Sequence, residues 1–132
     1  MTVGSFWGYG QGASWSAAQI VYSESAGWGG SAPTANSTIG NGELVVDTET
    51  GEIFVFMTRN NSAVLLARST DDGVSFSKAT DITADVKPER LGWGWYATTF
   101  SSLQMRFNAQ HKGRLVACKP PRYCWHLSGL QS

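Results

Sequence analysis

The chain has 132 residues, enough for one domain of ordinary size, and its ten basic and ten acidic residues cancel. This balance offers no basic surface for nucleic acid or an anionic membrane, and no stretch approaches the roughly 18 consecutive apolar residues of a membrane-spanning helix. Fifteen glycines together with six tryptophans favour short strands, many turns and large rings packed between sheets over a helical fold.

In chain order, the first strand is expected over residues 14–22, because Trp, Ile, Val and Tyr suit a pleated surface. Residues 23–38, rich in Ser, Gly and Ala, are expected to form a long loop, and loops of that length are more often functional or disordered than idle. A short, mostly apolar strand is expected over residues 43–47. Residues 48–51 then predict a turn with Gly51 in its closing position.

The strongest strand signal covers residues 52–58, which are β-branched and aromatic and contain neither Pro nor Gly. A turn at residues 59–62 leads to the next expected strand, residues 63–68. The apolar residues lie in short runs and do not recur at helical spacing. Residues 44–83 are therefore predicted to form an antiparallel meander of three or four strands joined by tight turns.

A glycine-containing turn, Ser69-Thr-Asp-Asp-Gly-Val-Ser-Phe76, closes this set. Gly73 can take the positive φ that a tight turn needs. The carboxylate of Asp71 can accept hydrogen bonds from amides of the turn itself. Phe76 is expected to fold back into apolar surroundings, so the segment predicts a structural turn that carries no chemistry.

Residues 87–90 interrupt any strand, and further strands are expected over residues 93–98, 102–107 and 114–118. Beyond them, the run Lys-Pro-Pro-Arg-Tyr-Cys-Trp-His shows no regular pattern. Residues 119–132 are therefore predicted to be an irregular tail.

The two cysteines, Cys118 and Cys124, have the spacing of no metal motif. Reduced thiols are the expectation, and a local disulfide is the alternative. His111 lies in a polar turn and His126 in the tail, and neither has an identifiable Ser or Cys partner for nucleophilic catalysis. No metal site and no cofactor are expected.

The turn at residues 69–76 has a weak echo earlier in the chain, since residues 8–15 align with it and place Gly12 on Gly73 and Trp15 on Phe76. The pattern Ser-x-Asp-x-Gly-x-x-aromatic at residues 69–76 resembles the Asp box, the repeated turn motif of sialidase β-propellers. Residues 8–15, which carry Gly at the Ser and Asp positions, read as a degenerate copy of that motif.

Four stretches in the same order resemble exo-α-sialidases (neuraminidases). They are the degenerate box with the strand after it, residues 38–51 with their Gly-Asn start and Thr-Gly turn, residues 68–83 ending in Asp-Ile-Thr, and residues 93–98 followed by 103–105 and 113–116. The chain departs from the family at Gly42, where the family has Pro, and at residues 99–102, where the family's Gly-rich segment is missing. The resemblance ends at Val116.

This resemblance implies an all-β fold made of about two blades of four-stranded antiparallel sheet from a six-bladed β-propeller. Residues 1–118 would form this partial propeller, and the chain is expected to be an internal fragment. Two blades expose apolar faces and open strand edges, so the rest of the propeller is expected to be needed for stability.

In function, the resemblance implies an exo-α-sialidase-type glycoside hydrolase that releases terminal sialic acid from glycoconjugates with retention, through a Tyr nucleophile. In the family a Glu serves the Tyr as base, an Asp is the acid/base, and three Arg hold the substrate carboxylate. By family order these residues fall outside the matched stretches, so no catalytic residue is assigned and the fragment is expected to be inactive alone.

The expected partner is a sialylated glycan, with no nucleic acid and no membrane span. The alternative is a non-catalytic Asp-box propeller that binds carbohydrate or protein.

The resemblance also marks candidate substrate-binding residues. Asn41 matches the Asn of the family's Gly-Asn-Pro segment, which reaches toward the sugar pocket, and Gln104 matches the Gln of Ile-Gln-Leu on an inner strand. Tyr96 could form a wall of the pocket, since rings pack on sugar faces. A turn Asn, a strand-face Gln and a core aromatic are the structural alternatives. Asp47 precedes a turn and is better explained as a turn cap than as an acid. The structural Asp box comprises Ser69, Asp71, Gly73 and Phe76.

Overall fold

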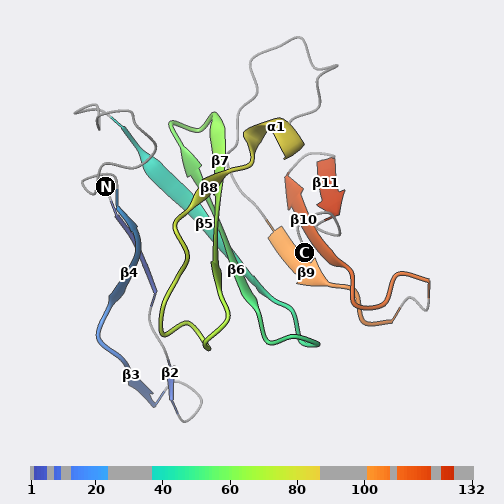
Figure 1. The fold of residues 1–132 in the computed structure, drawn as a ribbon, viewed down its shortest axis with the longest axis horizontal. Coiled ribbons are helices and arrows are strands. Elements are labelled where there is room, and N and C mark those ends of the chain that lie inside the picture. Colours follow the sequence, from blue (N-terminus) through green and yellow to red (C-terminus); the bar gives the residue numbers. More distant parts are fainter. Residues whose placement is uncertain are drawn as a thin grey trace.

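The computed structural model describes residues 2–5, 8–9, 13–23, 37–86, 101–107, 110–119 and 123–126. Over these ranges the chain is mostly β, with antiparallel strand pairs in every sheet (Figure 1). The strand expected at residues 93–98, the interruption at 87–90, the candidate residue Tyr96 and residues 24–36 of the expected loop lie outside the described residues.

The centre of the molecule is a four-stranded sheet with the order β5-β6-β7-β8. Its strands are β5 (Ile39–Val46), β6 (Ile53–Arg59), β7 (Ala63–Ser69) and β8 (Thr80–Asp81). Consecutive strands pair antiparallel, so the predicted meander is confirmed. Strand β5 begins earlier than the sequence predicted, because a bulge between Gly40 and Glu43 lets residues 39 and 40 join the pairing with β6.

The central strands are uninterrupted apolar runs because both faces of this sheet are covered. Side chains alternate along β6, and Phe54 and Phe56 belong to one buried cluster while Val55 and Met57 belong to another. The first cluster also contains Leu115 from near the C-terminus, and the second contains Tyr22 from near the N-terminus. Both ends of the chain therefore contribute to covering the central sheet.

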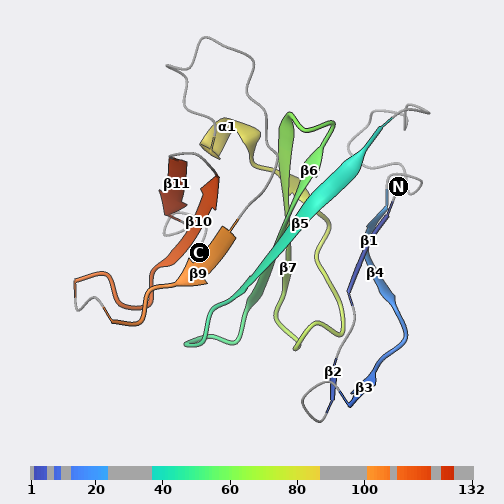
Figure 2. The same ribbon diagram turned by 180° about the vertical axis from the view of Figure 1, so that it is seen from behind.

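The N-terminal strands lie on one side of the central sheet in both views (Figures 1 and 2). Strand β1 (Thr2–Ser5) pairs with β4 (Gln19–Ser23), and β2 (Gly8–Tyr9) pairs with β3 (Ser14–Trp15). The single strand expected over residues 14–22 was wrong, because residues 16–18 interrupt it. The two parts pair with different partners, which a local pattern does not show.

A three-stranded sheet with the order β11-β10-β9 lies on the other side (Figure 2). It comprises β9 (Ser101–Gln104), β10 (Leu115–Lys119) and β11 (Tyr123–His126). The prediction of an irregular tail over residues 119–132 was wrong for Lys119 and for Tyr123–His126, because β11 pairs antiparallel with β10. Two prolines in the connection hid the strand, although the Tyr-Cys-Trp run after them has high β-propensity.

One helical turn, α1 (Thr83–Val86), was not expected from the sequence. The Thr83 amide donates to the Asp81 carboxylate at 2.9 Å, and this side-chain acceptor starts the turn. Val86 then enters the buried cluster of Phe54. Within the described ranges, no helix has the length and apolar character that crossing a membrane requires.

Candidate functional site

The two described candidate residues, Asn41 and Gln104, lie at opposite ends of the central sheet. In the meander the chain reverses after β5 and after β7 at one end, and after β6 at the other. Asn41 lies near the β6–β7 turn, whereas Gln104 contacts the β5–β6 turn. Six residues of strand from Asn41 to Asp47 span roughly 20 Å at about 3.3 Å each. The structure therefore does not bring Asn41 and Gln104 into one pocket.

Asn41 occupies the bulge of β5 in the left-handed region, with a φ of +52°. Asn is one of the few residues that tolerates this conformation. Its Nδ2 donates to Thr58 Oγ1 at 3.2 Å and to Asn61 Oδ1 at 3.4 Å. These contacts tie the bulge to the neighbouring strand and turn, so the side-chain amide of Asn41 has a structural task at this position.

Gln104 is the last residue of β9 and joins the three-stranded sheet to the β5–β6 turn. Its Oε1 accepts hydrogen bonds from the Thr48 amide at 3.0 Å and from the Thr48 hydroxyl. Its Nε2 donates to Asp47 Oδ1 at 2.8 Å and to the Gly113 carbonyl at 3.1 Å. We call this set of four hydrogen bonds the Gln104 clasp. It uses both polar atoms of the amide inside the protein.

Asp47 is buried and serves as the turn cap that the sequence favoured over an acid. Its Oδ1 accepts the Glu49 amide at 2.9 Å as well as the Gln104 side chain. Burial alone would raise the pKa of Asp47, but the hydrogen bonds from Glu49, Gln104 and Thr50 outweigh it and lower the pKa below its usual 3.8. A general acid near neutral pH needs a raised pKa, so this carboxyl is poorly suited to donating a proton.

The turn at residues 69–76 lies at the same end of the central sheet as the β5–β6 turn. Gly73 has the expected positive φ, at +77°. Asp71 accepts the Ser75 amide at 2.9 Å and the Ser69 hydroxyl at 2.8 Å, and Phe76 packs against the buried cluster of Tyr22. The buried Ser69 also accepts the Gly73 amide at 2.8 Å. This network holds the turn together. The identification of the turn as an Asp box rests on the sequence pattern and stays an interpretation.

The Asp71 turn is expected to weaken in acid. Hydrogen bonds from the Ser75 hydroxyl and amide and from Ser69 lower the pKa of Asp71 from 3.8 to about 2. Because the pKa in the folded chain lies below the unfolded value, this contribution is present above about pH 4 and is lost as the pH falls toward 2. Urea midpoints of the wild type and Asp71→Asn should differ at pH 7 and converge near pH 2.

Asp72→Asn is the matched control for this measurement. It removes the same charge one residue along without removing any hydrogen bond of the Asp71 carboxylate, and Asn tolerates the positive φ of +55° there. A difference between wild type and Asp71→Asn that stays constant from pH 7 to pH 2 would contradict the assignment.

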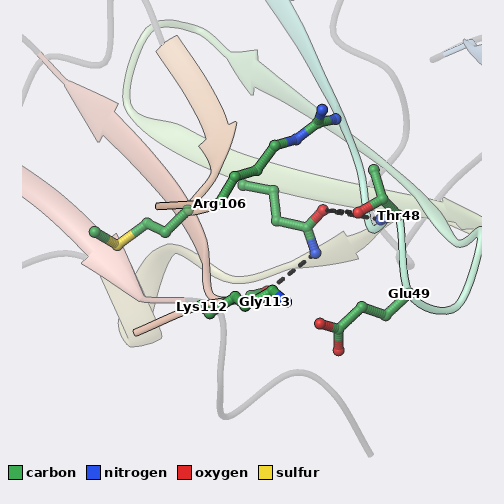
Figure 3. Close-up of a pocket in the computed structure, with 7 residues that line it drawn as sticks. Thr48, Glu49, Arg106, Lys112 and Gly113 are labelled. Carbon is green, nitrogen blue, oxygen red and sulfur yellow. Dashed lines mark hydrogen bonds between the residues drawn. The ribbon is translucent and has the colours of Figure 1, made fainter. Parts of the chain in front are cut away.

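A cavity of about 290 Å³ lies beside the Gln104 clasp (Figure 3). It is lined by Thr48 and Glu49 of the β5–β6 turn and by Gln104, Met105, Arg106, Lys112 and Gly113 of β9 and the β9–β10 connection. Among the described residues, neither Arg106 nor Lys112 is in an ion pair; the ion pair found there joins Arg68 and Glu52. The cavity thus presents two cations and one carboxylate.

Sequence reasoning did not identify this cavity, although a signal for it exists. Residues 105–114 contain Arg106, Lys112 and Arg114 and no acidic residue. Glycine at position 113 shapes the wall, because a Cβ on Gly113 would lie 2.8 Å from Glu49 Oε1, and Gly113 also has a φ of +83°. Glu49 therefore occupies the space that a larger residue would fill.

No group of three or more His, Cys, Asp or Glu that could hold a metal ion occurs among the described residues. Tyr96, the third candidate, lies outside them, so its role stays a prediction.

Comparison with known proteins gives a match at the level of structure. No family model matches the sequence, and no curated protein matches it. Among solved structures, a protein titled "Hadza microbial sialidase Hz136" superposes with a TM-score of 0.66 over 88% of this chain, at 24% sequence identity. The matched part is 25% of that protein, so this chain spans about a quarter of its length. The chain therefore has a sialidase-like fold over the 88% of its length that superposes.

Proposed function

We propose that this chain is part of a sialidase-type glycoside hydrolase whose complete form is a β-propeller and which releases terminal sialic acid from glycoconjugates. The observation that carries the proposal is the fold likeness to a sialidase over 88% of the chain. The ordered sequence stretches that resemble the family, from the degenerate box to residues 113–116, support it independently.

In such an enzyme the chemistry would belong to residues outside this chain's matched stretches. The anomeric carbon of a sialoside already carries a carboxylate, which repels an anionic nucleophile and favours a neutral Tyr. Arginine side chains would hold that carboxylate through paired hydrogen bonds. The part of this chain in the reaction would be to hold two neighbouring sheets in register, with the Gln104 clasp between them.

We expect the 132-residue chain alone to release no fluorophore from a 4-methylumbelliferyl sialoside, because no Arg triad or Tyr/Glu pair can be assigned in it. A product of the same gene extended in both directions is expected to release it. The measurement is fluorescence over time with protein whose mass has been verified. Steady release by the 132-residue chain, or none by an extended product that contains the Tyr and the arginines, would contradict the proposal.

The cavity beside the Gln104 clasp favours a second candidate, a non-catalytic module that binds acidic carbohydrate. At about 290 Å³ it lies just below the range of roughly 300–1,000 Å³ for small-molecule pockets, which suits a ligand no larger than one sugar unit. Arg106 and Lys112 would hold a carboxylate, and Glu49 would accept hydrogen bonds from hydroxyl groups. This combination suits a hydroxylated acid better than a simple anion.

Ligand-observed NMR with the 132-residue chain tests this candidate. We expect 3′-sialyllactose or glucuronic acid to bind, and lactose and acetate to bind much more weakly. Arg106→Gln should weaken binding about tenfold or more, because a hydrogen bond to a charged group contributes roughly 1.5–3 kcal/mol. Lys78→Gln makes the same charge change outside the cavity lining and should leave binding unchanged. Equal binding of lactose, or no effect of Arg106→Gln, would exclude this site.

A further inference from the structure

Cys118 and Cys124 stand directly opposite each other in the sheet. Strands β10 and β11 pair antiparallel, and Cys118 and Cys124 are Cα partners, flanked by the pairs Ala117 with Trp125 and Lys119 with Tyr123. The sequence spacing alone left reduced thiols and a disulfide both open. The register supplies the missing observation, because it places the two residues at the same level of the hairpin and on the same face.

The backbone geometry of such a pair suits a disulfide. Directly opposed residues in an antiparallel pair have Cα atoms about 5.5 Å apart in hydrogen-bonded positions and about 4.5 Å apart in the others. Disulfides usually join Cα atoms about 4.4–6.8 Å apart. Both kinds of pair therefore fall within the range that a disulfide spans without backbone movement.

We propose that Cys118 and Cys124 form a cross-strand disulfide that closes the β10–β11 hairpin. The two thiols lose two protons and two electrons, one S–S bond forms, and oxidised glutathione takes up the protons and electrons to give two molecules of reduced glutathione. Among the strands that the structure describes, β11 is an outer strand of its sheet and pairs with β10 alone. A covalent bond to β10 would fasten this outer strand, and it does not depend on the proposed hydrolase or on the cavity.

The inference is tested with the full 132-residue chain in glutathione redox buffers, with free thiols blocked by N-ethylmaleimide and intact mass measured. The chain has two cysteines, so a single intramolecular bond is possible. Tryptic digestion should give one cross-linked species that joins residues 115–122 to residues 123–132. Covalent dimers in place of this species would overturn the proposal.

Proximity in the sequence could also bring the thiols together in an unfolded chain, so the folded register needs its own test. We expect the equilibrium with glutathione to favour the disulfide at least about tenfold more in native buffer than in 8 M urea, because the hairpin holds the thiols together only when folded. Equal equilibria in the two solvents would show that the register does not bring the cysteines together.

The matched control moves one thiol by a single position. The double substitution Ala117→Cys with Cys118→Ser keeps the short separation in sequence but places the two thiols on opposite faces of the hairpin, because side chains alternate along a strand. The native preference over urea should disappear in this variant. Its persistence would overturn the proposal.

Discussion

Replacing Phe54 with Ala is expected to remove a large part of the stability of this fold. Phe54 is fully buried in the cluster that joins the central sheet to α1 and β10, and the Arg68 guanidinium lies 5.3 Å from the centre of its ring. Truncating a buried Phe to Ala costs about 3–5 kcal/mol through lost burial and the cavity left behind. Domains have free energies of unfolding of only about 5–15 kcal/mol. Urea unfolding followed by tryptophan fluorescence measures the loss.

Phe107→Ala is the control for this experiment. It is the same substitution at a side chain that is fully exposed, and it should change the free energy of unfolding by less than about 0.5 kcal/mol. If the two variants unfold at similar urea concentrations, the Phe54 cluster is not the core of the molecule.

The second large effect is expected at the Gln104 clasp. Gln104→Leu removes the donor to the buried Asp47 carboxylate, which is left without this partner, and it also removes the acceptor of the exposed Thr48 amide. We expect a loss of roughly 2–3 kcal/mol, since a hydrogen bond to a charged group contributes more than a neutral one. Urea unfolding of the single variants and of the double variant with Asp47→Asn would measure the coupling between the two residues.

Gln19→Leu provides the comparison. It removes another Gln whose Nε2 donates across the fold, to the Val74 carbonyl at 2.6 Å, but this hydrogen bond is exposed and its partner is uncharged, so water can replace it. Its cost should be small. A coupling of zero between Gln104 and Asp47, or equal costs for the two Leu variants, would show that the clasp does not hold the two sheets together.

The central meander could be predicted from the sequence because short, local stretches of sequence determine its strands and turns. Residues 52–58 and 63–68 are apolar strands separated by short turns, and Asp71 and Gly73 are the residues that such a turn requires. The observed strands Ile53–Arg59 and Ala63–Ser69 differ from the expected ones by about one residue at their ends.

The site could not be predicted in the same way, because its contacts join distant parts of the chain. Gln104 was singled out for a sugar, yet its amide bonds to Asp47 and Thr48, more than fifty residues earlier. Arg106 and Lys112 become candidate ligand-binding residues only because the β9–β10 connection lies beside Glu49 and lines one cavity with it. The strand Tyr123–His126 was missed because two prolines precede its β-prone residues, and because its pairing with β10 is not visible in a local pattern.

The contribution of both chain ends to covering the central sheet has a consequence for how the protein folds. The strands β5 to β8 are joined by short connections, so their pairing closes small loops at little entropic cost. Tyr22 and Leu115 reach opposite faces of β6 only after much longer loops close. Contacts that close long loops form slowly. We therefore expect the meander to form first during folding, and the two outer layers to dock on its opposite faces later.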